Sequence, residues 1–143
     1  MKIVECVPNF SEGRNRRTIG AITGAIEGTE GVTLLDVDPG AGANRTVVTF
    51  VGGPEAVAEA AFAAIARAAQ LIDMRTHQGG HARMGATDVC PFVPVSGVTT
   101  EECVQLARQL ARRVASELSI PVYLYEDAAT SEARRNLADI RAG

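Results

Sequence analysis

Three observations predict a mixed α/β domain for this chain of 143 residues. Short runs rich in β-branched residues, typical of strands, alternate along the chain with longer segments of helical period. Apolar residues make up 46% of the sequence, which suffices for a core, but only 4% are aromatic, so aliphatic side chains and alanine must fill it. The length suits one domain, and no linker or low-complexity tract divides it.

Three strands and one helix are predicted for the first part of the chain. Residues 3–7 are β-branched and are closed by a proline, whereas the polar residues 9–14 predict a loop. Isoleucines spaced three and four apart predict a helix over about residues 15–27. Residues 32–38 predict a largely buried strand. Residues 45–51 predict another, antiparallel to it across a turn rich in proline and glycine.

An alanine-rich helix, a long loop and a strand are predicted next. The helix starts at Gly53-Pro54, since proline in the first turn loses no hydrogen bond, and runs to about residue 72. Its small side chains predict close packing onto the sheet or onto another subunit. Residues 73–88 have no regular period, and a loop of this length is more often functional than idle. Residues 89–95 predict a strand that two prolines place at an edge or in a bulged course.

The last part predicts a helix, a strand and a helix. Thr99 and Glu102 have the spacing of a capping box, and the apolar positions after them predict an amphipathic helix that ends before Pro121. Residues 122–125 then predict a strand and residues 131–141 a short helix. Three arginines on the polar side of the amphipathic helix are expected to be solvated: Arg108, Arg112 and Arg113.

The predicted order is β-α-β-β-α-β followed by α-β-α. Its first six elements match the split βαβ, or ferredoxin-like, arrangement. We therefore predict an α/β (α+β) fold, a ferredoxin-like sandwich whose mixed or antiparallel sheet has helices on one face, with a C-terminal α-β-α extension. Residues 1–143 are expected to form one domain.

Composition excludes several classes of protein. The formal net charge of −3 argues against neutralising nucleic-acid phosphates. No apolar run reaches the roughly 18–20 residues of a membrane span, and the N-terminus lacks the features of a signal peptide. The cysteines Cys6, Cys90 and Cys103 form no CxxC pair, which favours reduced thiols in a cytoplasmic protein.

Both histidines of the chain, His77 and His81, lie in the long loop among glycines, together with Arg75 and Arg83. A histidine suits proton transfer near neutral pH, and arginine binds carboxylates through two hydrogen bonds. Three interpretations remain open: a metal site, which lacks a third ligand at a suitable spacing; histidines that cap turns; and an acid/base site for an anionic substrate. We favour the third.

Two further clusters carry polar side chains. Asn9 and Ser11 precede a predicted helix, where side chains and free amides suit an anion, although both residues can equally cap the turn. Asp36 and Asp38 flank the predicted hairpin with Arg45, and alternation places the two aspartates on one side. One aspartate suits a general base or a ligand for an amidine-like cation, while a solvated face is the simpler interpretation. No phosphate-binding glycine motif is present.

These clusters carry a resemblance that covers nearly the whole chain. The segment VPNFSEGRN and the loop pattern H-x-G-x-H-x-R-M-G are specific to the N-terminal subdomain of glutamate formimidoyltransferase, a family that includes one half of formimidoyltransferase-cyclodeaminase. The chain resembles that subdomain in six segments, which are residues 4–15, 34–38, 44–52, 71–95, 121–126 and 134–143.

The resemblance implies transfer of a formimidoyl group from N-formimidoylglutamate, a late intermediate of histidine breakdown, to N5 of tetrahydrofolate. Folate is then a co-substrate, and no metal is needed. The family's catalytic histidine falls on His81, which would act as general acid/base, and Asp38 would hold the cationic amidine or assist the proton transfer. Substrate binding would involve the remaining residues of these clusters, which are Asn9, Ser11, Arg45, His77 and Arg83.

Two departures from the family pattern are evident. The loop commonly reads H-x-G-E-H-P-R-M-G, whereas this chain has Gly80 and Ala82 at the glutamate and proline positions, which is expected to leave His81 more mobile and less well tuned. The resemblance also implies a second subdomain that follows the segment at 134–143 and is not expected within these 143 residues, so a homodimer or a partner subdomain is expected. A catalytically silent folate-binding or assembly module, or one half of a split transferase, is the alternative, and a metal-dependent hydrolase is a third.

Overall fold

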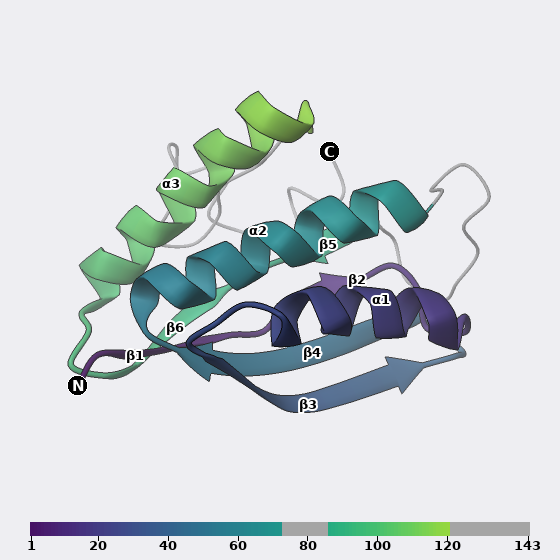
Figure 1. Ribbon diagram of the computed structural model, residues 1–143, viewed down its shortest axis with the longest axis horizontal. Coiled ribbons are helices and arrows are strands. Elements are labelled where there is room, and N and C mark those ends of the chain that lie inside the picture. Colours follow the sequence, from purple (N-terminus) through teal and green to yellow (C-terminus); the bar gives the residue numbers. More distant parts are fainter. Residues whose placement is uncertain (73–85, 121–143) are drawn as a thin grey trace.

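A computed structural model describes residues 1–72 and 86–120 (Figure 1). In chain order its elements are β1 (Ile3–Cys6), β2 (Asn9–Phe10), α1 (Arg16–Glu27), β3 (Val32–Gly40), β4 (Arg45–Gly52), α2 (Pro54–Leu71), β5 (Thr87–Val89), β6 (Phe92–Ser96) and α3 (Thr100–Leu118). In these two ranges, no helix is long and apolar enough to cross a bilayer.

The strands form one antiparallel sheet. β4 pairs with β3 on one side and with β1 and β2 on the other, so that β1 and β2 act as one interrupted strand. β6 pairs with β1, and β5 pairs with β2. The resulting order confirms the predicted ferredoxin-like sandwich. Of the C-terminal extension only α3 is described, because the predicted elements at 122–125 and 131–141 lie outside the described residues.

Alternate residues of the central strands form the core. Val4, Cys6 and Phe10 on β1 and β2, with Val48 and Phe50 on β4, are at most 1% exposed. They belong to one apolar cluster with residues of α1 and α2, and these helices cover the same face of the sheet (Figure 1). The burial of one set of alternating side chains therefore fixes which face of each strand points to the helices.

The alanine-rich helix packs inside the chain. α2 lies against α1 and against the sheet. The alanines of its inner side are at most 1% exposed, and they are Ala60, Ala61, Ala64 and Ala68. Small side chains let the helix approach both neighbours closely. This confirms the first of the two packing partners predicted for it, the sheet.

Several predicted boundaries are wrong. Pro8 interrupts the first strand, but pairing resumes in β2, where a loop was predicted. Cys90 and Pro91 likewise divide the predicted strand at 89–95 into β5 and β6. β3 extends to Gly40 and has no fully buried residue, because it pairs only with β4 among the described strands and a bulge at Leu35 leaves that side chain 56% exposed.

Arg113 is partly solvated, with 37% of its side chain exposed, but it also contacts α2. Its guanidinium donates to Glu59 of α2 at 2.7 Å and to Glu117 of α3 at 2.9 Å, and it stacks 3.8 Å from the ring centroid of Phe62. α3 packs against α2 through this side of the helix, so Arg113 joins the two helices. The Nε atom of Arg108 is also buried.

Candidate functional site

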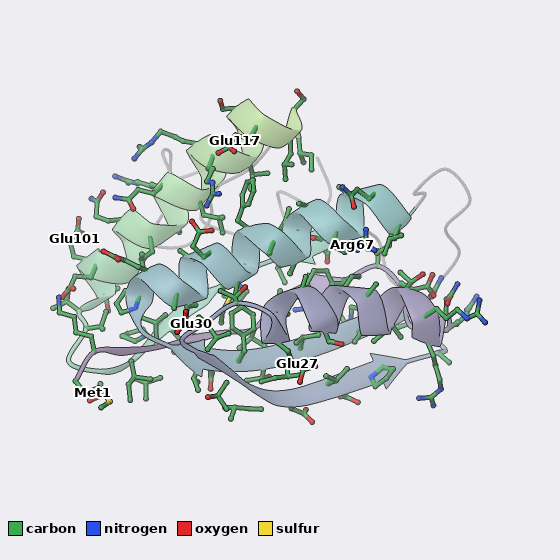
Figure 2. All side chains as sticks on the ribbon, in the orientation of Figure 1. Met1, Glu27, Glu30, Arg67, Glu101 and Glu117 are labelled. Atoms are coloured by element: carbon green, nitrogen blue, oxygen red, sulfur yellow. The ribbon has the colours of Figure 1, made fainter. Side chains whose placement is uncertain are left out.

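Within residues 1–72 and 86–120, no helix covers the face of the sheet opposite α1 and α2, and partly exposed side chains project from that face (Figure 2). We call it the open face. By strand register its members are Glu5, Asn9, Thr33, Asp36, Asp38, Arg45, Val47, Thr49, Val51, Val89 and Val93.

Three of the predicted site residues share one end of the open face. Asn9 of β2 pairs with Val47 of β4, and Val47 pairs on its other side with Asp38 of β3. Adjacent strands lie about 4.8 Å apart, so Asn9 and Asp38 stand roughly 10 Å apart across Val47. Arg45, two residues before Val47, is on the same side of β4. An amide, a carboxylate and a guanidinium therefore surround an apolar centre.

Ser11 has a different environment. It is 0% exposed, and its backbone N–H donates to the carbonyl of Ala86 at 2.8 Å. This bond attaches the segment after β2 to the first described residue after the long loop. Ser11 is therefore buried where this segment meets the end of that loop, whereas the side-chain amide of Asn9 donates to the carbonyl of Val7 at 3.3 Å.

The backbone N–H groups at the start of α1 donate hydrogen bonds to side chains of the protein itself. The Glu12 carboxylate accepts from the backbone N–H groups of Arg14 and Asn15, both at 3.0 Å. The Asn15 side chain accepts from those of Arg17 and Thr18 at 3.0 and 3.2 Å. The sequence suggested that these amides are free to bind an anion. They are instead hydrogen-bonded to side chains of the protein. The turn-capping alternative describes this segment better, although Glu12 and Asn15 do the capping.

Two residues of the predicted polar clusters that were not proposed as site residues hold the rim of the site. The backbone N–H of Gly13 donates to the Asn44 side chain at 2.8 Å, and Asn44 has a positive φ of 52°. A Cβ on Gly13 would lie 2.5 Å from the backbone nitrogen of Arg45, so only glycine fits. The Thr46 hydroxyl adds a 2.6 Å bond to the Glu12 carbonyl. Glycine before a helix and asparagine in a turn were the available signals.

The loop residues His77, His81 and Arg83 lie outside the described residues. The structure gives the positions of the described residues on either side of that loop. α2 ends at Leu71, and Ala86 is bonded to Ser11 beside the open face. In residues 1–72 and 86–120, no group of three or more His, Cys, Asp or Glu side chains is placed to hold a metal ion.

Comparison with known proteins gives one consistent match. The family model described as "Formiminotransferase domain, N-terminal subdomain" matches residues 3–143. The formimidoyltransferase-cyclodeaminase of Rattus norvegicus is 58% identical over 142 residues, which cover 99% of this chain and 26% of that protein. The glutamate formimidoyltransferase of Streptococcus pyogenes serotype M1 is 51% identical over 142 residues, covering 99% of this chain and 48% of that protein. The chain thus spans about a quarter to a half of the length of these relatives.

Proposed function

Because the chain belongs to the formiminotransferase domain family, as its N-terminal subdomain, we propose that it forms one wall of a formimidoyl-transfer site. The donor is N-formimidoylglutamate and the acceptor is N5 of tetrahydrofolate, which acts as co-substrate. The observation that carries this proposal is the placement of Asn9, Asp38 and Arg45 around Val47, on the sheet face that no described helix covers.

The chemistry requires one proton donor and acceptor near neutral pH. Folate N5 attacks the formimidoyl carbon and must lose a proton, and the glutamate nitrogen must gain one as its bond to that carbon breaks. His81 takes the first proton and delivers the second. A positioned general acid/base contributes about 10²–10⁴-fold to the rate. His81 is five residues before Ala86 in the sequence, so about 18 Å of extended chain at most separates their Cα atoms.

The charges of the open face suit the substrates. Asp38 is an exposed carboxylate that complements a cationic amidine, and Arg45 complements the carboxylates that both glutamate and folate carry. Asn9 supplies an amide for hydrogen bonding. His77 and Arg83 are proposed to bind substrate from the long loop. Ser11, which is fully buried, contributes by fixing Ala86 against the strand that carries Asn9.

The opposite wall of the site is proposed to come from a second subdomain or a partner chain. The relatives named formimidoyltransferase extend well beyond the part that this chain matches. The apolar members of the open face, among them Val93 at 41% exposed, are suited to being covered. A catalytically silent folate-binding module is the second candidate, since it needs the same open face without turnover.

Turnover of N-formimidoylglutamate with tetrahydrofolate tests the proposal, first with the chain alone and then with the second subdomain supplied. We expect His81→Ala to lower the rate about 10²–10⁴-fold and Asp38→Asn to lower it about 10–100-fold through a lost charge-assisted contact. Glu27→Gln, at an exposed carboxylate at the end of α1 on the helix side, is the matched control and should leave the rate unchanged.

The outcomes separate the two candidates. Activity that disappears in His81→Ala supports the acid/base role. Equal activity in the His81→Ala variant and the parent contradicts it. Tetrahydrofolate binding without turnover, even with the second subdomain present, favours the silent module.

A further inference from the structure

Two thiols lie in contact on the helix side of the sheet. The Sγ atoms of Cys6 and Cys90 are 3.6 Å apart and share a hydrogen bond. Cys6 is the last residue of β1 and is 0% exposed, whereas Cys90 lies in the break between β5 and β6 and is partly exposed. Residue Cys90 is therefore partly accessible to solvent, whereas Cys6 is not.

The backbone holds the pair on both sides. Cys6 is in register with Phe92 of β6, and Asn9 is in register with Val89 of β5. Between these pairings the Val7 N–H donates to the Pro91 carbonyl at 3.2 Å. The break between β1 and β2 thus lies beside the break between β5 and β6. At these two breaks the sulfur atoms of Cys6 and Cys90 lie side by side.

We propose that Cys6 and Cys90 form a redox-sensitive pair that closes to a disulfide when a hydroperoxide oxidises it. The Cys90 thiolate attacks one peroxide oxygen, the O–O bond breaks, and water leaves after taking a proton, which gives a sulfenic acid. The Cys6 sulfur then attacks the Cys90 sulfur, the S–O bond breaks, and the hydroxide leaves as water with the Cys6 proton. Two thiols and one hydrogen peroxide give one disulfide and two waters.

The order of the steps follows from exposure. Burial, followed by the hydrogen bond with Cys90, raises the pKa of Cys6 well above its ordinary value, so Cys6 remains a thiol at neutral pH. Cys90, which solvent reaches, meets the oxidant first, and Cys6 resolves the sulfenic acid. Closure is expected to accelerate with rising pH because the thiolate of Cys6 is the better nucleophile.

Closure would join the two strand breaks covalently. Asn9 lies three residues after Cys6, and β5 ends directly before Cys90. The bond would therefore fix two neighbouring strands where they carry the Asn9 end of the open face. The inference rests on the thiol geometry alone and holds whether or not the chain transfers a formimidoyl group.

Thiol counting on the native, intact protein tests the inference. After treatment with hydrogen peroxide and denaturation, we expect the number of free thiols to fall from three to one and the mass to fall by that of two hydrogen atoms. Dithiothreitol should reverse both changes. Peptide mapping should find Cys6 linked to Cys90 and should leave Cys103, which is buried on α3, as the free thiol.

Two variants make the result decisive. Cys90→Ser changes the partly exposed member of the pair and should abolish the mass loss, while Cys103→Ser should retain it. Three thiols remaining in the treated parent, a gain of oxygen mass at Cys90 with Cys6 unmodified, or a Cys90 link to a second copy would each overturn the inference. Closure that occurs only in urea would do so as well.

Discussion

The two faces of this sheet differ sharply although the same strands build them. Val48 is 0% exposed and packs under the helices, whereas its neighbour Val47 points to the open face between Asn9 and Asp38. On β1 and β2, Val4, Cys6 and Phe10 likewise point inward. One periodicity thus divides the sequence into residues that determine the fold and residues that remain available for chemistry.

The two faces place different constraints on the amino-acid sequence. Inward residues such as Val48 and Phe50 tolerate replacement by side chains of similar volume and hydrophobicity, because their role is packing. Outward residues have polar groups whose identity matters only when something binds. Stability measurements should therefore respond to one face and activity measurements to the other.

Deleting inward side chains should give the largest effect. We expect Phe50→Ala to lower the free energy of unfolding by about 3–5 kcal/mol and Val48→Ala by about 2 kcal/mol, measured by urea denaturation. Val47→Ala, the same change one residue away, should cost less than about 1 kcal/mol. Equal losses for the two valines would mean that the open face is as tightly packed as the core, and the contrast between the faces would fail.

The rim held by Gly13 and Asn44 offers a second test, because it lies directly before Arg45 of the open face. Gly13→Ala would place a methyl group against the Arg45 backbone and should cost about 1–3 kcal/mol of stability. Gly42→Ala, in the neighbouring turn, meets no atom within 4 Å and should change stability by less than about 0.5 kcal/mol. If Gly13→Ala is as stable as its control, the rim is more adaptable than its contacts indicate.

The smallest effect is expected at the ion pair between Lys2 and Glu102, 2.9 Å apart on the surface of the helix side. The hydrogen bond from Lys2 and then the Thr99 amide lower the pKa of Glu102. Its contribution to stability is therefore present above the ordinary glutamate pKa and is lost as the pH falls through the lowered value. Lys2→Met should raise the pKa of Glu102 partway to normal, as NMR titration would measure. An unchanged pKa would assign the whole effect to Thr99.

Much of this fold follows from local pattern. The capping box of Thr99 and Glu102 and the proline start of α2 are both confirmed. Pattern failed where tertiary pairing overruled it. Pairing with Val47 and Thr46 of β4 makes a strand of two residues after Pro8. The contact of Arg113 with Glu59 and Phe62 depends on how two helices meet, which no period within α3 can reveal.

The candidate site likewise has features that local sequence predicts and features that depend on tertiary structure. Alternation correctly placed Asp36 and Asp38 together, but their position beside Asn9 needs the order of three strands. The burial of Ser11 needed its bond to Ala86, 75 positions further along. Local sequence thus supplied the chemistry of the site, and topology supplied its arrangement.

The bulge at Leu35 sets the phase of β3. Before it, Thr33 shares the open face and odd-numbered residues point outward; after it, Asp36 and Asp38 do so and even-numbered residues point outward. If β3 continued the alternation set by Thr33 without the bulge, Asp36 and Asp38 would point toward the helices and Val37 toward the open face. The one extra residue at Leu35 therefore decides that this end of β3 presents an acidic surface, and not an aliphatic one, on the open face.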